Sequence, residues 1–164
     1  ALSNIKISFI IVDGVQHTVL NGVDVESRIR TLEVANGASR VSAIGFVRRA
    51  LVALQQEMGK EGGVVMDGRD IATVVFPNAE LKLFMTADPM VRAQRRAAEM
   101  EAKGEKVDIQ DVLKNLQERD YIDSHREVSP LTQAEDAVVL DNSYMSMEEQ
   151  LEWLKGIIKE RFSC

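Results

Sequence analysis

Three charged residues surround a glycine in the segment Asp67-Gly68-Arg69-Asp70. The apolar run before it, after two glycines, predicts a buried strand over residues 63–67, and ligands of open α/β sheets bind beyond the carboxyl ends of strands. A charged surface turn explains the segment equally well on position alone. However, the next stretch, residues 71–77, is too apolar for a solvated loop. We therefore expect these charges at the lip of a buried segment, with Gly68 letting the backbone pass close to a ligand.

A second candidate group contains two arginines and a carboxylate, Arg119, Asp123 and Arg126. Their offsets of four and three residues place all three on one face of a helix. Guanidinium groups can grip a phosphate bidentately, and the carboxylate between them can accept a hydrogen bond from a sugar hydroxyl. A ladder of surface salt bridges is the common alternative, and the spacing alone favours it.

A third group, Arg92, Arg95 and Arg96, lies along one side of a predicted helix, and little negative charge offsets it in sequence before Glu99. Arginines arranged in this way can neutralise phosphates during transfer, although a solvated helix face is a strong alternative.

A fourth and weaker pair is Ser39 with Arg48, a hydroxyl and a guanidinium that could bind the edge of a base. Of the 20 basic residues, 12 are arginine, and the candidate sites use arginine alone. This bias towards planar guanidinium groups is consistent with anion recognition.

Short strands and then helices are predicted in the first part of the chain. Residues 5–25 read as an antiparallel β-meander, because Asp13-Gly14 and Asn21-Gly22 are hairpin-turn dipeptides. From residue 27 to residue 58 the apolar spacing becomes helical, with a break expected at Gly45.

Strands alternate with helices in the rest of the chain. After the predicted strand at 63–67, further apolar runs predict strands at 81–86 and 137–141. Helices are expected after three caps: Asp88 followed by Pro89, Asp108, and the capping box that begins at Ser146. This alternation predicts an α/β fold with a mainly parallel sheet flanked by helices.

Composition restricts the function classes. The chain has 164 residues, enough for one domain, with a net charge of −6. Aromatic residues make up 5%, which disfavours a stacking platform for single-stranded nucleic acid. The single cysteine, Cys164, excludes a disulfide framework, and two histidines far apart disfavour a zinc site. With no apolar run of membrane-spanning length and no signal peptide at the start, a cytoplasmic setting is expected.

The segment 63–79 closely resembles the "DGRDxGTVVFPDA" signature of bacterial cytidylate kinases. Three further stretches match in order: 28–36 resembles "IRTxEVAN", 118–126 resembles "ERDxxDxxR" and is followed by Ser-Pro-Leu, and 134–141 resembles a late strand of the family. The resemblance spans nearly the whole chain and implies a P-loop kinase-like sheet. It also implies a small antiparallel β and helical insert, which binds the monophosphate, over residues 1–60. Residues 61–164 would form the core, with a lid over about 92–125.

The resemblance also implies chemistry, namely transfer of a phosphoryl group from ATP to CMP or dCMP with Mg²⁺. Ser39, Arg48 and Asp70 would face cytosine, whose exocyclic amine donates to Asp70, and Asp123 would hold a ribose hydroxyl. Three arginines would grip the α-phosphate of the acceptor, namely Arg69, Arg119 and Arg126. The lid that closes over ATP would include Arg92, Arg95 and Arg96. The partners implied are these nucleotides alone, with no nucleic acid or membrane, and the protein is expected to be a monomer.

The chain departs from the family pattern in three ways. Ala72 stands where glycine is usual, and Asn78 where aspartate is usual. The glycine-rich Walker A loop, G-x-x-x-x-G-K-[ST], does not occur in the 164 residues. We therefore expect that an N-terminal portion, with the central strand of the sheet, is missing, and that this chain alone has little kinase activity.

Two other function classes stay open. A non-catalytic module that binds pyrimidine nucleotides would also need no Walker A loop. An interaction or structural protein, whose arginines only solvate helices, would bind CMP without saturation.

Overall fold

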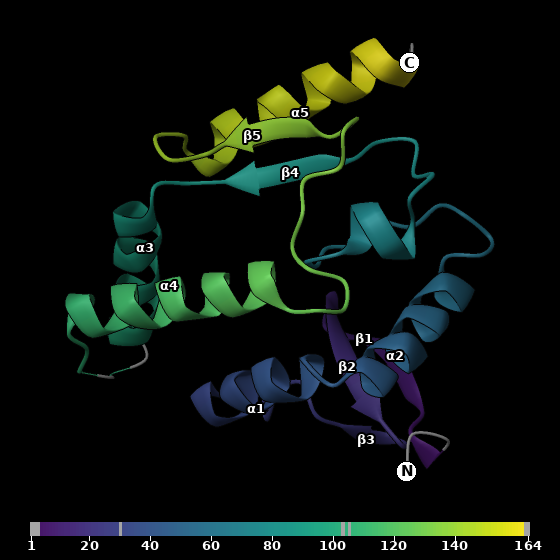
Figure 1. Ribbon diagram of the computed structural model, residues 1–164, viewed down its shortest axis with the longest axis horizontal. Coiled ribbons are helices and arrows are strands. Elements are labelled where there is room, and N and C mark those ends of the chain that lie inside the picture. Colours follow the sequence, from purple (N-terminus) through teal and green to yellow (C-terminus); the bar gives the residue numbers. More distant parts are fainter. Residues whose placement is uncertain (1–3, 30, 103, 105, 163–164) are drawn as a thin grey trace. The chain divides into compact units, whose positions relative to one another are not determined.

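A computed structural model describes residues 4–29, 31–102, 104 and 106–162. The chain divides into two compact units: Ala1–Met66 with Arg126–Val128, and Asp67–His125 with Ser129–Cys164. Figure 1 shows the elements of both units, and each unit is described by itself.

The first unit contains a three-stranded antiparallel sheet, in the order β1 (Ile7–Val12), β2 (Val15–Leu20) and β3 (Val23–Asp24). Val12 pairs with Val15 and Leu20 with Val23, so each connection is a two-residue turn. Both turns have positive φ at their two central residues, which are Asp13 (50°), Gly14 (79°), Asn21 (50°) and Gly22 (83°). Two-residue hairpins favour this geometry because its twist matches that of the strands. The predicted β-meander is confirmed.

Two helices follow the sheet, α1 (Leu32–Ser42) and α2 (Gly45–Met58). The prediction that helix begins near residue 27 is wrong, because Thr31 is extended and its hydroxyl caps α1 by accepting from Val34 N at 3.3 Å. The predicted break between the two helices is present, but it lies just before Gly45. Ala43 and Ile44 separate the helices, and Gly45 is the first residue of α2.

The second unit contains a parallel pair of strands, β4 (Leu83–Thr86) and β5 (Val138–Asp141), with Leu83 opposite Val138. Between them run α3 (Pro89–Ala102) and α4 (Ile109–His125), and α5 (Met147–Phe162) follows β5. Parallel strands joined through helices form the α/β arrangement that the sequence predicted, and both strand predictions are confirmed to within two residues.

The predicted caps of the three helices are all present. Asp88 Oδ1 accepts from the N–H groups of Met90 and Val91 at 2.8 and 3.1 Å. Asp108 Oδ1 accepts from Gln110 N at 2.7 Å. Ser146 and Glu149 form the reciprocal capping box, with bonds of 2.7 and 3.1 Å. These caps fix where each helix begins.

The predicted strand at residues 63–67 is wrong. Residues 64–67 are irregular, and Val65 is fully exposed at 104%. Gly62 and Gly63 have φ of 73° and 64°, so the backbone turns just before the apolar run. An extended segment becomes a strand only through hydrogen bonds to a neighbour, and among the described residues both sheets form without it.

The apolar segment after Asp70 forms a single turn of π-helix, η2 (Ile71–Val75). Val75, at 2% exposed, is the most deeply buried large side chain among the described residues. The expectation that the charged segment lies at the edge of a buried one is confirmed in part, because Val75 is buried while residues 71–74 and 76 are half-buried. Turns of π-helix are rare and occur frequently at functional sites.

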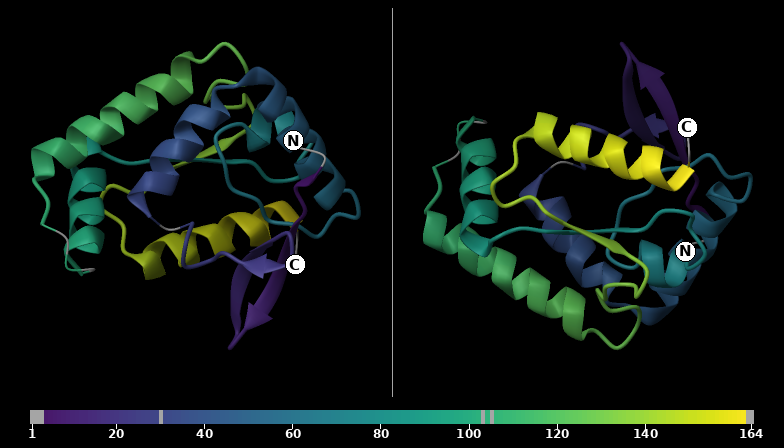
Figure 2. Two further views of the ribbon diagram at one scale, coloured as in Figure 1. Left: turned by 90° about the horizontal axis from the view of Figure 1, so that it is seen from below. Right: turned by 90° about the horizontal axis from the view of Figure 1, so that it is seen from above.

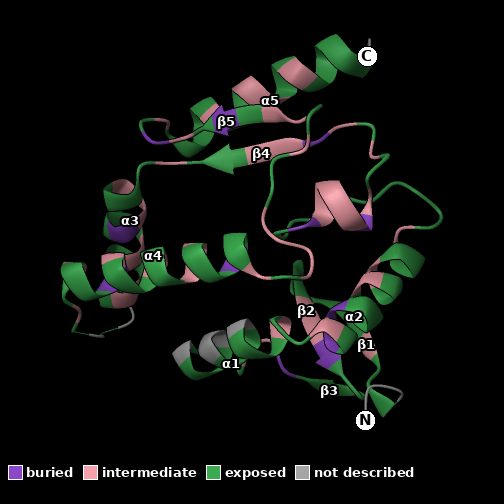
Figure 3. Cartoon of the chain, in the orientation of Figure 1, coloured by how far each residue is buried: buried purple, intermediate pink, exposed green. Residues whose placement is uncertain are grey.

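Two neighbouring helices and an ion pair stabilise the second unit. α3 and α4 lie side by side in Figures 1 and 2, and Ala93 and Ala97, one turn apart on α3, are buried. Figure 3 shows that buried residues are otherwise scattered thinly along the ribbon. Where β4 and β5 begin, Lys82 Nζ, which is almost fully buried, donates to both carboxylate oxygens of Asp136 at 2.8 Å. This contact holds the pKa of Asp136 below its usual value.

Within the described part of the chain, the helices lack the combination of length and apolar character that crossing a membrane requires.

Candidate functional site

An ion pair between Arg69 and Asp123 joins the charged segment to helix α4. Arg69 Nε donates to Asp123 Oδ2 at 2.9 Å, across 54 positions of sequence. The side chain of Asp123 is 12% exposed, whereas that of Arg69 is 48% exposed. The carboxylate is therefore mostly removed from water, and its charge is compensated by a guanidinium that still reaches solvent.

Arg119 lies one helical turn before Asp123 on α4, on the same side of the helix. It is half-buried and forms no ion pair or hydrogen bond with any residue that the structure describes. Its guanidinium charge is therefore not paired with any carboxylate that the structure describes. Arg69, Arg119 and Asp123 come from the first and second of the predicted candidate groups, and the fold brings the two groups together.

Asp70 and Gly68 show why the charged segment has its particular sequence. Asp70 is buried, at 7% exposed, and its backbone oxygen accepts from Val74 N and Val75 N to begin η2. A Cβ on Gly68 would lie 2.9 Å from a side-chain carbon of Ile71, which is closer than real Cβ atoms come. The backbone at Gly68 therefore lies close to a side chain of η2, and this contact accounts for the glycine.

The three arginines of α3 each bind different residues. Arg92 donates to both carboxylate oxygens of Asp120 on α4, at 2.5 and 3.0 Å. Arg96 pairs with Glu99 on its own helix at 3.0 Å. Arg95 donates to Asn142 Oδ1 and to the Asn142 carbonyl oxygen, at 3.1 and 2.7 Å. The interpretation that these arginines lack negative charge nearby is wrong for Arg92, because its partner comes from another helix.

A polar cluster that sequence reasoning missed follows β5, at the carboxyl ends of both parallel strands. Ser143 is buried; its hydroxyl accepts from Asp88 N at 2.7 Å and donates to Asp141 Oδ1 at 2.6 Å. Hydrogen bonds from the hydroxyl and the backbone N–H of Ser143 hold the pKa of Asp141 below its usual value. Asn142 Nδ2 donates to Gln150 of α5 at 3.0 Å. The cluster could have been found by applying to β5 the strand-end rule applied to residues 67–70.

Three of the predicted site residues belong to the first unit. Arg48, on α2, is buried at 9% exposed and donates to the carbonyl oxygen of Ser42 at 3.2 Å. Ser39 lies in α1, and its side chain is outside the described residues. Arg126 follows α4, which ends at His125, so the prediction that it shares one helical face with Arg119 is wrong. Ser129, with φ of 52°, follows soon after and helps to turn the chain away from the helix direction.

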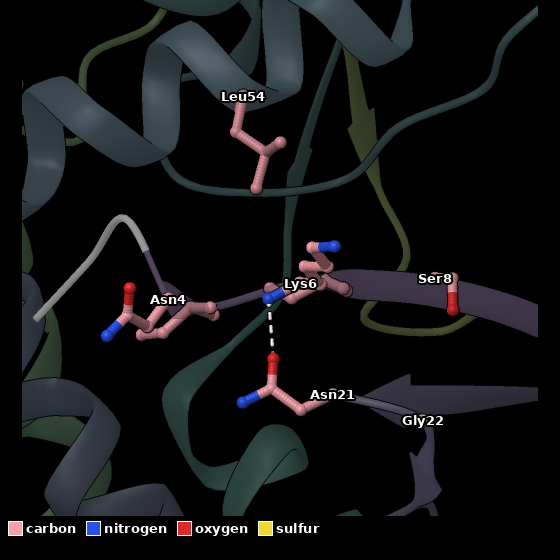
Figure 4. A pocket seen from close by; sticks show the side chains of 8 residues that line it. Asn4, Lys6, Ser8, Asn21, Gly22 and Leu54 are labelled. Atoms are coloured by element: carbon pink, nitrogen blue, oxygen red, sulfur yellow. Dashed lines mark hydrogen bonds between the residues drawn. The ribbon is translucent and has the colours of Figure 1, made fainter.

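Two hollows in the surface lie away from these residues. One, of about 700 Å³, lies in the first unit, where Leu54 of α2 projects towards the segment that starts β1 (Figure 4). Lys6 N donates to Asn21 Oδ1 across it at 2.8 Å. Another lies along α4, lined by Gln117, Glu118, Tyr121 and Ile122. Neither is lined by a predicted site residue, so the candidate site is defined by its charged side chains.

Among the described residues, no group of three or more histidine, cysteine or acidic side chains could hold a metal ion. A Mg²⁺ ion that arrives with a nucleotide needs no such group, because it binds mainly to phosphates and water with one or two carboxylates.

Comparison with known proteins identifies the family of this chain. The family model described as "Cytidylate kinase" matches residues 1–160. A cytidylate kinase of Parabacteroides distasonis is 66% identical over 137 residues, covering 84% of this chain and 60% of that protein. Cytidylate kinases of Bacteroides thetaiotaomicron and Bacteroides fragilis are 60% and 56% identical, over 84% and 93% of this chain and 60% and 68% of theirs.

The chain thus spans about 60% of the length of the first two of these relatives. The family match nevertheless extends from the β-meander to α5 and includes both segments that supply the Arg69–Asp123 pair. The chain belongs to the cytidylate kinase family.

Proposed function

We propose that this chain supplies the CMP-binding part of a nucleoside-monophosphate kinase, which transfers the γ-phosphoryl group of ATP to CMP or dCMP. One observation carries the proposal: the fold places Arg69 against Asp123, one turn from an Arg119 that has no partner among the described residues. Guanidinium groups beside a carboxylate suit a ligand that has both a phosphate and a sugar hydroxyl.

Arg69 has donors to spare for an anion. Only its Nε is used by Asp123, and its terminal NH groups make no hydrogen bond to the described residues. We assign the α-phosphate of CMP to Arg69 and Arg119, together with Arg126, and a ribose hydroxyl to Asp123. Because Asp123 is mostly buried, its charge is screened weakly and can orient both Arg69 and the sugar.

Base recognition is assigned to the buried Asp70, with Ser39 and Arg48. An ionised carboxylate only accepts hydrogen bonds, so it matches the exocyclic amine of cytosine and repels the carbonyl oxygen that uracil carries at the same position. The burial of Asp70, at 7% exposed, supports this role.

The ATP side is assigned to α3, with its arginines Arg92, Arg95 and Arg96 as the positively charged face of the lid. Phosphoryl transfer depends on positioning and on charge stabilisation more than on a strong base. Mg²⁺ bound together with ATP would neutralise part of the charge of its phosphates. The chain's own contribution is to hold the acceptor phosphate and to exclude water when the lid closes.

A second candidate is a non-catalytic module that binds pyrimidine nucleotides. The Arg69–Asp123 pair beside Arg119 suits nucleotide binding with or without phosphoryl transfer. Both candidates predict CMP binding, and they differ in turnover. Low turnover by this chain stays a prediction, as do the cytoplasmic setting, the monomeric state and the domain and lid boundaries.

Isothermal titration of the chain with CMP, dCMP and UMP tests the proposal. We expect saturable binding of CMP and dCMP with one site per chain, and weaker binding of UMP. Arg119→Ala should weaken CMP binding about tenfold or more, since a charge-assisted hydrogen bond contributes about 1.5–3 kcal/mol. Arg161→Ala, an exposed arginine on α5, is the matched control. Equal affinity for CMP in both variants would contradict the assignment.

A further inference from the structure

A bidentate ion pair joins α3 to α4 at Arg92 and Asp120. The two terminal nitrogens of Arg92 donate to the two carboxylate oxygens of Asp120, at 2.5 and 3.0 Å. The side chains are 34% and 39% exposed, so water screens the pair only in part. The hydrogen bonds to Asp120 raise the pKa of Arg92. Parallel two-point contacts of this kind fix geometry as well as add stability.

The position of Asp120 on α4 gives this pair a role for the site. Asp120 and Asp123 are three residues apart, so they project about 60° from each other around the helix. Asp120 binds α3 through Arg92, while Asp123 binds the segment before η2 through Arg69. Two ion pairs, which leave α4 in directions about 60° apart, thus hold the helix against two different elements. A rotation of α4 about its axis would break at least one of them.

The side chain whose direction depends most on the rotation of α4 is that of Arg119. It directly precedes Asp120 and makes no ion pair with the described residues, so the chain aims its guanidinium only through the orientation of α4. By contrast, Arg96 pairs with Glu99 three residues along the same helix, and that contact constrains nothing outside α3.

We infer that Asp120 is a positioning residue, whose ion pair with Arg92 fixes the rotation of α4 and so aims Arg119 and Asp123 at the bound nucleotide. The inference rests on the proposed function of those two residues. It gives the lid arginine Arg92 a further role, bracing α4, because both of its terminal nitrogens donate to the Asp120 carboxylate.

The first test measures helix orientation and needs no ligand. Spin labels at the exposed positions Ala98→Cys and Asn115→Cys, in a Cys164→Ser background, report the distance between α3 and α4. We expect Asp120→Asn to broaden the distance distribution, and the charge reversal Arg92→Asp with Asp120→Arg to narrow it again. Glu99→Gln, which breaks the pair within α3, is the matched control and should leave the distribution unchanged. A distribution unaltered by Asp120→Asn would overturn the inference.

The second test measures CMP affinity of the same variants. Asp120→Asn should weaken binding about fivefold, the order expected when an interaction at a distance modulates a site. Glu99→Gln should not weaken it, and the charge reversal should recover most of the loss. A broadened helix pair with unchanged CMP affinity would also overturn the inference. If the unaltered chain fails to bind CMP, the proposed function fails, and the distance measurement still decides whether Asp120 fixes α4.

Discussion

Arg69 Nε lies 2.9 Å from Asp123 Oδ2, so a residue in an irregular segment and a residue on α4 share one ion pair. The two residues are 54 positions apart, so this contact depends on the fold and not on local sequence. The contact makes the stability of the second unit and the geometry of the proposed nucleotide site depend on one carboxylate.

Replacing the Asp123 carboxylate should therefore affect both stability and CMP affinity. Asp123→Asn removes the charge that orients Arg69, and we expect CMP affinity to fall about tenfold. Because Arg69 is half exposed, the loss in free energy of unfolding should be only about 1 kcal/mol. Titration calorimetry and urea denaturation measure the two effects. Glu118→Gln, an exposed carboxylate on the same helix, is the control; an equal loss of affinity in that variant would contradict the assigned role of Asp123.

Substitution of Asp70 should change selectivity more than affinity. In Asp70→Asn the side chain gains amide donors, which can bond to the carbonyl oxygen of uracil, so the preference for CMP over UMP should fall about tenfold. The ratio of the two dissociation constants is the measurement. Asp67→Asn tests a neighbouring exposed carboxylate of the same segment and should leave the ratio unchanged. An unaltered ratio in Asp70→Asn would count against its contact with the base.

The contact between Lys82 and Asp136 should make stability depend on pH. The pKa of Asp136 is lowered in the folded state by hydrogen bonds from Lys82. The stability that this provides is fully present above the pKa of an unfolded aspartate, about 3.9, and is lost as the pH falls through the lower folded value.

We therefore expect Asp136→Asn to lower Tm at pH 7, because the buried ammonium of Lys82 loses its partner. As the pH is lowered from about 4.5 to 2.5, the Tm of Asp136→Asn should also fall less than that of the unaltered chain. Thermal unfolding followed by circular dichroism at several pH values tests this. The exposed neighbour Glu135→Gln should keep the full pH dependence. Parallel curves for Asp136→Asn and the unaltered chain would refute the linkage.

Two glycines should respond to alanine in opposite directions. Gly22 has φ of 83° in the second hairpin turn, which a Cβ disfavours, so Gly22→Ala should destabilise by about 1 kcal/mol. Gly156 lies inside α5 with open space around its Cα, so Gly156→Ala should stabilise by about 0.5–1 kcal/mol. Chemical denaturation of the two variants compares them. If both substitutions changed the free energy of unfolding in the same direction, the backbone conformation at position 22 would not explain the effect of Gly22→Ala.

The local elements were predictable from the sequence because their signals are local. The two turn dipeptides gave the register of the β-meander, and Asp88, Asp108 and Ser146 marked the starts of α3, α4 and α5 through single side-chain caps. The failure at residues 63–67 has the opposite cause. An apolar run says that a segment can form a strand, but the strand itself requires a hydrogen-bonding neighbour, which no local pattern specifies.

The candidate site was predictable by residue type and only partly by contact. Helical spacing placed Arg119 and Asp123 on one face, but it could not show that α4 ends before Arg126. The pairing of Arg92 with Asp120 was not foreseen, because the 28 positions between them include the turn that joins two helices. Side-chain contacts between elements depend on how the elements pack, and the sequence pattern of each element alone does not determine this.

The central claim is that the Arg69, Asp123 and Arg119 group binds CMP, and the most direct measurement is an NMR titration of arginine side chains. In a chain labelled with ¹⁵N-arginine, CMP should shift the Nε–Hε signals of Arg69 and Arg119 in proportion to one saturable site, while that of Arg161 on α5 stays unchanged. Signals of Arg69 and Arg119 that do not move at saturating CMP, or that move no more than that of Arg161, would contradict the account.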